Sequence, residues 1–146
     1  MAIENLQEVL KKLDEIKKAT EKGVTEGLKA TSLRVIRDAK SRCKSQTNGK
    51  GLLAASITAE IENNKATIGT NVKYAPYVEL GTGLFAKNGD GRQDVPWHYI
   101  DAKGKWHTTS GQHPKPFLQP ALDANRKNAE KDIANEIKRS LKEVEK

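Results

Sequence analysis

The chain has 146 residues, of which 36% are hydrophobic and 31% charged, and its formal net charge is +7. This length suits one domain with a small core, and no apolar run reaches the roughly eighteen residues that a membrane-spanning helix needs. With Cys43 as its single cysteine, the chain excludes an internal disulfide.

Residues 1–44 carry the longest periodic pattern. Apolar residues and two threonines recur close to the 3.6-residue period, which predicts one helix from about Ile3 to Cys43. They are Leu6, Leu10, Leu13, Ile16, Thr20, Val24, Leu28, Thr31, Val35 and Ala39. At about 1.5 Å per residue the helix is roughly 60 Å long, whereas a globule of this chain length has a radius of gyration of about 15 Å. The helix therefore breaks near Gly23, or part of its apolar stripe meets another subunit.

A polar turn is expected at residues 45–50, followed by a hairpin in residues 51–83. Alternation of apolar and polar residues around Ala59 predicts a half-buried strand from about residue 56 to 61. Residues 62–65 read as a four-residue loop, because asparagine tolerates the left-handed region. Ala66 and Ile68 then share the inner face of the return strand.

The stretch YAPYVELGTG, residues 74–83, is the most informative part of the chain. Pro76 favours a helical turn that begins near it, and glycine tolerates the positive φ that ends such a turn. Two compatible interpretations remain open for the side chains. Tyr74, Tyr77 and Leu80 share a face and form a small core, and Glu79 and Thr82 contact a neighbouring subunit.

Residues 84–112 are expected to form a mobile loop over 84–95 and a second hairpin over 97–108. The turn of this hairpin is placed at residues 101–104, and Trp97 and Trp106 are expected to pair across its strands. Aromatic side chains beside lysines also suit stacking on nucleic-acid bases, so both interpretations stay open.

The last element is a helix over residues 116–145, beginning at about Phe117 and ending at Val144. Pro120 lies in its first turn, where a missing N–H costs little. Two favourable ion pairs are expected, Asp123 with Lys127 and Glu136 with Arg139. Its apolar stripe is predicted to comprise Leu118, Leu122, Ala129, Ile133, Ile137, Leu141 and Val144.

No convergent set of chemical groups stands out. His98, His107 and His113 do not have the spacing of a zinc site, and Cys43 has no histidine near it in sequence. We therefore expect no catalytic, cofactor or metal site, no small-molecule substrate, and a protein that is not an enzyme.

Three blocks of sequence resemble one known family. They are YAPYVELGTG, then WHYIDAKGKWHTTSGQ at residues 97–112, then PFLQPALD at residues 116–123, with a weaker match in GLLAASI at residues 51–57, where the family's sheet begins. Together they resemble the tail-component family of siphophages (tail-completion, neck or head–tail joining proteins), over residues 31–125.

The resemblance implies a virion structural protein that acts by subunit contacts at the head–tail junction. Its implied partners are neck, connector and tail proteins of the phage, further copies of itself in a ring, and packaged DNA. The alternative is a small basic nucleic-acid-binding protein, since +7 favours acidic partners. The same lysines and arginines also suit a solvated helix surface.

The predicted fold is α+β, a single domain over 1–146 with a small, mainly antiparallel sheet and long N-terminal and C-terminal helices packed on it. The candidate residues for the family motif and for assembly contacts are Tyr74, Ala75, Pro76, Tyr77, Glu79, Gly81, Thr82, Gly83, Trp97, Trp106, Pro116, Phe117 and Pro120.

Overall fold

The computed structural model describes residues 2–46 and 51–146. The α+β fold is confirmed, with 59% of the chain helical, long helices at both ends, and two small antiparallel sheets of two strands each. None of the helices in this described part is long and apolar enough to cross a membrane. The chain forms two compact units, described in turn. The first unit comprises residues 2–38, 58–68 and 122–146, and the second comprises residues 39–57 and 69–121.

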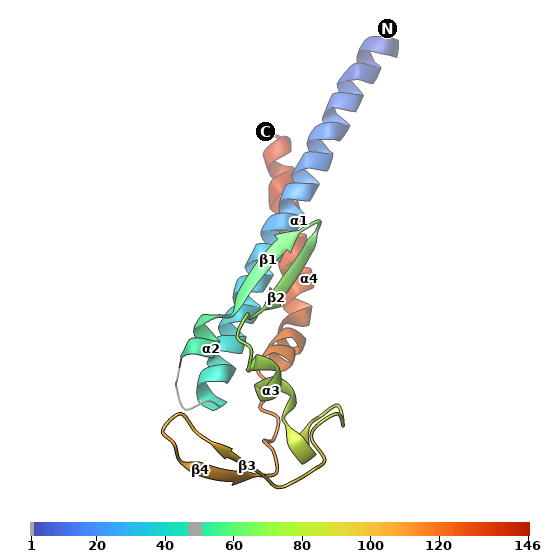
Figure 1. Cartoon of the computed structure of the whole chain (residues 1–146). Helices are drawn as coiled ribbons and strands as arrows, with labels where there is room; N and C mark the ends of the chain where they lie inside the picture. Colours follow the sequence, from blue (N-terminus) through green and yellow to red (C-terminus); the bar gives the residue numbers. More distant parts are fainter. Residues whose placement is uncertain (1, 47–50) are drawn as a thin grey trace. The chain divides into compact units, whose positions relative to one another are not determined.

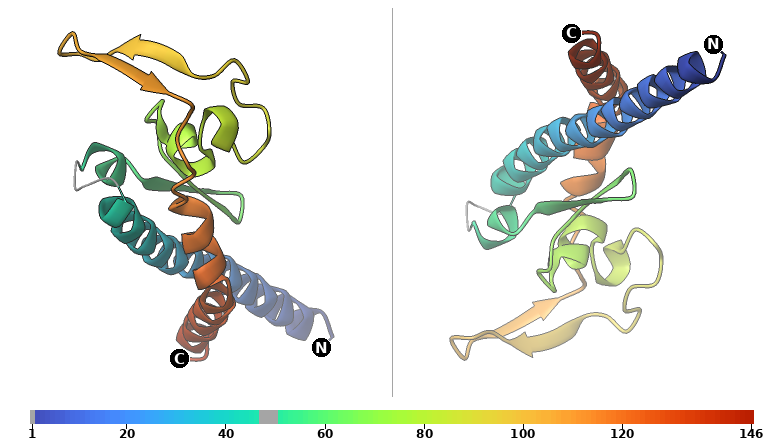
Figure 2. Two further views of the ribbon diagram at one scale, coloured as in Figure 1. Left: turned by 90° about the horizontal axis from the view of Figure 1, so that it is seen from below. Right: turned by 90° about the horizontal axis from the view of Figure 1, so that it is seen from above.

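The N-terminal helix α1 (Ala2–Gln46) runs without a break, so the predicted alternative of a break near Gly23 is wrong. Its glycines serve close packing instead. A Cβ added to Gly23 would lie 2.5 Å from the Ile137 Cα, and one added to Gly27 would lie 2.5 Å from the Ile133 Cα. The C-terminal helix α4 (Leu118–Val144) therefore crosses α1 in an antiparallel sense with the two backbones in contact (Figures 1 and 2).

Polar pairs flank this α1–α4 seam within the first unit. Arg34 donates to both carboxylate oxygens of Asp132, at 3.0 and 3.2 Å, and Lys22 donates to Glu143 at 2.9 Å. The bidentate Arg34 pair matters most, since its carboxylate is largely buried and exposed pairs contribute little.

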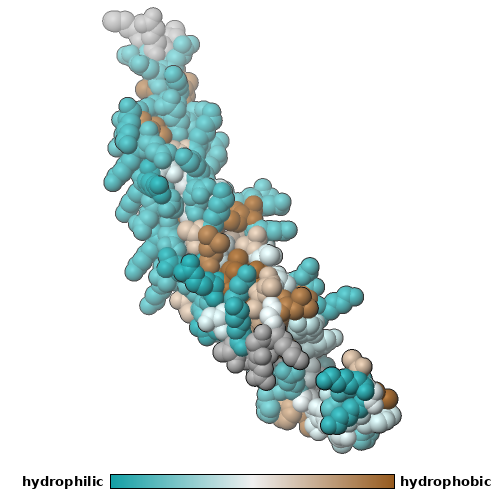
Figure 3. All heavy atoms as spheres, turned by 90° about the vertical axis from the view of Figure 1, so that its left-hand side faces the viewer, coloured by the Kyte–Doolittle hydropathy of each residue, from teal (hydrophilic) through white to brown (hydrophobic). Residues whose placement is uncertain are grey.

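The N-terminal part of α1 extends beyond this seam. Lys12 Nζ donates to the Val144 carbonyl at 3.4 Å, where α4 ends. Farther along α1, the predicted apolar stripe is exposed, with Leu6 at 55% and Leu13 at 56% of their full exposure. Figure 3 shows apolar patches on this part of α1 within a hydrophilic surface. The stripe exists as predicted, but α4 covers only part of it.

The first sheet pairs β1 (Thr58–Glu62) with β2 (Lys65–Gly69). Its alternating burial is confirmed, with Ala59 and Ile61 half-buried between exposed neighbours. Asn63 and Asn64 have φ of 49° and 59°, so both occupy the left-handed region as expected. The loop has two residues rather than four, because Glu62 and Lys65 belong to the strands.

In the second unit the segment expected to begin the sheet is instead a short helix, α2 (Leu52–Ala55). Leu53 and Ala54 are buried on this helix, which accounts for the apolar run in the sequence. The run is too short for its periodicity to distinguish a helix from a strand. The predicted polar turn at residues 45–50 is wrong for 45 and 46, which are helical, and its remainder lies outside the described residues.

The second sheet is the hairpin of β3 (Trp97–Ile100) and β4 (Trp106–Thr109). Trp97 lies opposite Thr109 and Trp106 opposite Ile100, so the predicted Trp97–Trp106 pair is wrong. Trp97 and Trp106 could face each other only across a two-residue turn, whereas residues 101–105 separate the two strands. Within this turn the Asp101 carboxylate accepts the N–H of Lys103 at 2.8 Å and of Lys105 at 3.0 Å. These bonds stabilise the turn.

On α4 the predicted apolar stripe is largely confirmed. Ile133, Ile137, Leu141 and Val144 are half-buried, whereas Leu122 is exposed and does not belong to the stripe. The predicted Glu136–Arg139 pair is present at 3.9 Å, and Asp123 pairs with Arg126 at 3.6 Å.

Candidate functional site

The family-like stretch forms the short helix α3 (Ala75–Leu80) in the second unit, with Pro76 in its first positions and Gly81 ending it at φ 79°. The predicted helical turn is therefore confirmed. Its tyrosines do not form a core, because Tyr77 is 60% exposed and Tyr74 43%, while Ala75 is the buried residue of the helix. The interpretation of a tyrosine-rich core is wrong: the short turn buries its alanine and turns both rings outward.

Glu79 points from α3 to the beginning of α4. Its carboxylate accepts the backbone N–H groups of Phe117 at 2.8 Å, Leu118 at 3.0 Å and Gln119 at 2.9 Å. The first N–H groups of a helix have no partner within the helix, and they favour a negative charge. Glu79 therefore acts as the N-terminal cap of α4, from 38 to 40 residues away along the chain.

Pro120 completes this cap. It occupies the third position of α4, where its missing N–H removes the next donor that would need a partner. The residue before α4 is Phe117, which is 1% exposed and anchors the helix start in the core. Phenylalanine has no side-chain acceptor, so the helix has no local cap. Pro116, half-buried, directly precedes it.

The glycines and Thr82 attach the end of α3 to residues 110–112. Thr82 exchanges two hydrogen bonds with Gln112: its N–H donates to the Gln112 carbonyl at 2.9 Å and its hydroxyl accepts the Gln112 N–H at 2.9 Å. Gly83 and Gly111 both have positive φ, and a Cβ on either would collide with the backbone of the other segment. This contact therefore requires glycine at both positions.

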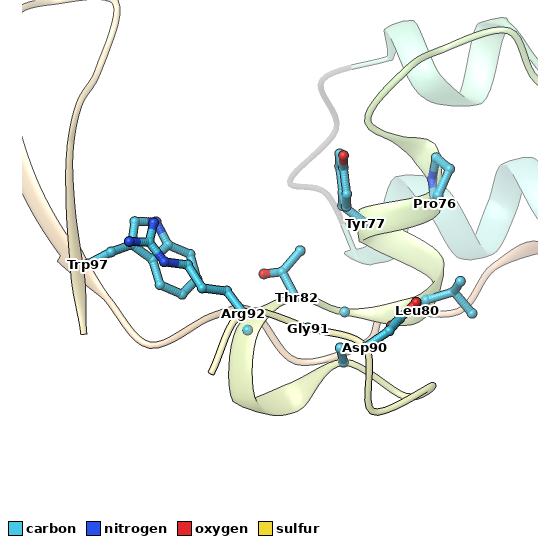
Figure 4. Close-up of a pocket in the computed structure, with 11 residues that line it drawn as sticks. Pro76, Tyr77, Leu80, Thr82, Asp90, Gly91, Arg92 and Trp97 are labelled. Carbon is cyan, nitrogen blue, oxygen red and sulfur yellow. The ribbon is translucent and has the colours of Figure 1, made fainter. Parts of the chain in front are cut away.

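A pocket of about 370 Å³ opens beside α3 (Figure 4). Pro76, Tyr77 and Leu80 supply apolar surface from α3, and Trp97 supplies it from β3. The Arg92 guanidinium lies 5.2 Å from the centre of the Trp97 ring, a cation–π contact that both side chains show in Figure 4. We call this cavity the motif pocket.

A second hollow of about 290 Å³ shares Pro76 and Leu80 with the motif pocket. Its other walls include Ala75, Phe117 and Leu118, so it is strongly apolar. Two apolar hollows thus adjoin α3, and together we call them the α3 groove. Such concave apolar surfaces are typical of binding sites.

The histidines are used in pairwise contacts. His98 Nδ1 lies 2.8 Å from the Thr108 hydroxyl, His113 stacks on Phe85 at 3.8 Å, and His107 Nε2 lies 2.9 Å from Asp101. The pKa of Asp101 is lowered, first by the Lys105 N–H and then by His107. Within the described residues no group of three histidine, cysteine or acidic side chains could hold a metal ion.

The structure places the predicted residues in two groups. Tyr74 and Trp106 lie outside both hollows, with exposed rings. The other predicted residues lie around the α3 groove or the cap of α4: Ala75, Pro76, Tyr77, Glu79, Gly81, Thr82, Gly83, Trp97, Pro116, Phe117 and Pro120. Contacts of Glu79 and Thr82 with another subunit stay a prediction, since both side chains have partners within the chain. Sequence reasoning missed Arg92, which no pattern marks.

Comparison with known proteins supports the resemblance read from the sequence. The model of a family described as "Bacteriophage HK97-gp10, putative tail-component" matches residues 7–81, just over half of the chain, and the chain therefore belongs to this family of phage tail components. The match begins nearer the N-terminus than the resemblance did, and it ends within YAPYVELGTG. No curated protein and no solved structure matches the chain.

Proposed function

We propose that this phage tail component acts at the head–tail junction, as a tail-completion or neck protein that forms a symmetric ring. Membership of the family gives it a structural role in the tail and contact with other tail proteins in the virion. The location at the head–tail junction and the ring go beyond the family description, and the exposed apolar surface of α1 supports them.

The exposed apolar stripe of α1 carries this proposal. Leu6, Val9, Leu10 and Leu13 are each more than half exposed, at successive positions of one helix face. Full burial of such a side chain contributes about 1.5–3 kcal/mol, so covering the exposed half of these four gains roughly 4 kcal/mol. A monomer does not gain this free energy. Each contact in an assembly that buries the four side chains does gain it, and the gain offsets part of an association cost of about 4 kcal/mol or more.

Sedimentation velocity tests the ring. The wild type is expected to associate as its concentration rises, and the combined variant Leu6→Gln/Leu10→Gln/Leu13→Gln is expected to stay monomeric. Leu33→Gln is the matched control, because Leu33 is an equally exposed leucine on α1 outside this stripe. Circular dichroism confirms that the variants remain helical. A wild type that stays monomeric at its highest concentration, alone and with phage connector and tail proteins, contradicts the proposal.

The alternative, binding to nucleic acid, is supported by the net charge of +7 and by the exposed Trp106 on a hairpin that carries Lys103 and Lys105. Contact with packaged DNA within a ring would use the same charges. Fluorescence anisotropy with random duplex DNA separates the cases. Affinity that falls steeply between about 50 and 200 mM salt supports DNA contact. Absence of binding at low salt excludes DNA contact.

We also propose that residues 84–95 and the hairpin of β3 and β4 are docking elements that become ordered on assembly. The short helix η1 (Gly83–Phe85) begins this segment, and the rest up to β3 contains turns and irregular backbone. Limited proteolysis of the free protein is expected to cut first within residues 84–112. Equal resistance of this segment and of α1 contradicts the proposal.

A further inference from the structure

We propose that the exposed N-terminal ridge of α1 in one copy docks in the α3 groove of a second copy. The α1 ridge is defined by Leu6, Val9, Leu10 and Leu13. This inference rests on the proposed ring, because it names the two surfaces that meet in it.

The α1 ridge has the form of a ligand for a groove. Its side chains stand at spacings of three and four residues, so they project from one face of the helix as a row. Amphipathic helices bind apolar grooves through anchors at such positions. The ridge lies on the face that also carries Gly23 and Gly27, where α4 packs, and it continues that face beyond the end of α4.

The α3 groove has the form of a binding site for such a helix. Its two hollows of about 370 and 290 Å³ lie next to each other, because both include Pro76 and Leu80. Two aromatic rings line the groove, the exposed Tyr77 on α3 and the half-buried Trp97 on β3. Each volume is large enough for more than one aliphatic side chain.

Charged side chains adjoin both surfaces. On the ridge, Lys12 and Asp14 flank Leu13 in sequence, and at the motif pocket Asp90 and Arg92 lie on the loop that forms one wall. A helix docked in the motif pocket can bring Lys12 toward Asp90, and Asp14 toward Arg92 in exchange for their pairs with Lys18 and Asp94 within the chain. Such charge pairs select among orientations of the docked helix more than they add affinity.

Pairing of ridge with ridge is the simplest competing arrangement. Such pairing uses the ridges of two copies in a single contact and leaves the α3 groove of both copies empty. Docking of ridge in groove instead covers both apolar surfaces of each copy within a ring, through two contacts that each involve about 13 Å of helix (residues 5–13). It is a head-to-tail contact, which closes into a ring when the rotation between copies allows it.

A mixing experiment tests the inference. The ridge variant is Leu6→Gln/Leu10→Gln/Leu13→Gln, and the groove variant is Tyr77→Lys/Asp90→Lys, which changes two exposed side chains of the motif pocket. Tyr74→Lys is the matched control, because this exposed tyrosine lies outside both hollows and should leave association unchanged.

Each variant alone is expected to be monomeric, since every copy lacks one of the two surfaces. Mixed together they are expected to form a 1:1 complex with twice the monomer mass by sedimentation, and the indole N–H signal of Trp97 in the labelled ridge variant should shift on titration. A groove variant that still associates alone indicates pairing of ridge with ridge and overturns the inference. So does a mixture that shows neither complex nor shift while the wild type associates. A wild type that never associates overturns the proposed ring itself.

Discussion

The variant Glu79→Ala tests the cap of α4, because it removes the Glu79 carboxylate. The variant leaves three backbone N–H groups without their acceptor. A hydrogen bond to a charged group contributes about 1.5–3 kcal/mol, so three would sum to about 4.5–9 kcal/mol. That sum is an upper bound, because water reaches the exposed Gln119 and replaces the bond there.

The bonds to Phe117 and Leu118 are partly buried and decide the magnitude. Two such bonds at the lower value give about 3 kcal/mol, somewhat above the usual 0.5–2 kcal/mol for loss of a helix cap. Glu79→Gln keeps one acceptor oxygen in place of two, so we expect about half of this loss. With an m-value of about 2 kcal/mol per molar urea, Glu79→Ala should lower the unfolding midpoint by about 1.5 M.

Urea unfolding followed by circular dichroism measures the stability, and hydrogen exchange of the amides at residues 117–119 locates the effect. Glu62→Ala, which removes an exposed carboxylate at the end of β1, is the matched control and should change stability by less than about 0.5 kcal/mol. If Glu79→Ala and Glu62→Ala unfold alike and the three amides stay protected, Glu79 is not the cap and our reading of α3 is wrong.

Three further predictions concern the seam, the hairpin and the thiol. Gly23→Ala and Gly27→Ala should each destabilise the protein by about 1–3 kcal/mol despite their better helix propensity, because the added methyl meets the α4 backbone; Gly69→Ala, where an added Cβ meets nothing within 4 Å, should be nearly neutral in the same unfolding assay. In the folded protein the pKa of Asp101 lies below its ordinary value of 3.8, so the contribution of Asp101 to the β3–β4 hairpin is complete above that pH and is lost as the pH falls through the lower folded pKa. Cross-strand NOEs that persist unchanged down to about pH 2 would oppose this. The buried Cys43 thiol should react with a thiol reagent many times faster in denaturant than in buffer, and equal rates would show that it is accessible.

Most of the elements could be predicted because their signals are local. The period of α1 and of α4, the alternation around Ala59, the asparagine turn and the proline that begins α3 each act within a few residues. Local rules of this kind need no knowledge of distant parts of the chain.

The incorrect predictions concern residues whose role is set by a partner that lies far away in the sequence. Gly23 looked like a weak point of a helix, yet it is the position where a second helix comes closest. In the second hairpin the turn occupies residues 101–105, where the Asp101 carboxylate accepts two backbone N–H groups, and this length keeps Trp97 and Trp106 from facing each other. Leu122 fitted the apolar period of α4 but lies just outside the buried face.

The role of Glu79 shows the same limit at the candidate site. Its sequence neighbours offered no basic partner at helical spacing, because its partner is the beginning of a helix 38 residues away. One signal was available: the long C-terminal helix has a proline in its first turn but no serine, threonine, aspartate or asparagine immediately before it. A helix that lacks a local cap needs an acceptor from elsewhere in the chain.

The division of one cap between two distant segments constrains how the sequence can vary. A relative that loses the acid at position 79 should gain a serine, threonine or aspartate at position 117 to start the last helix by itself, giving up the buried ring there. The two positions should therefore change together, and a chain that carried neither solution would begin its final helix a turn later.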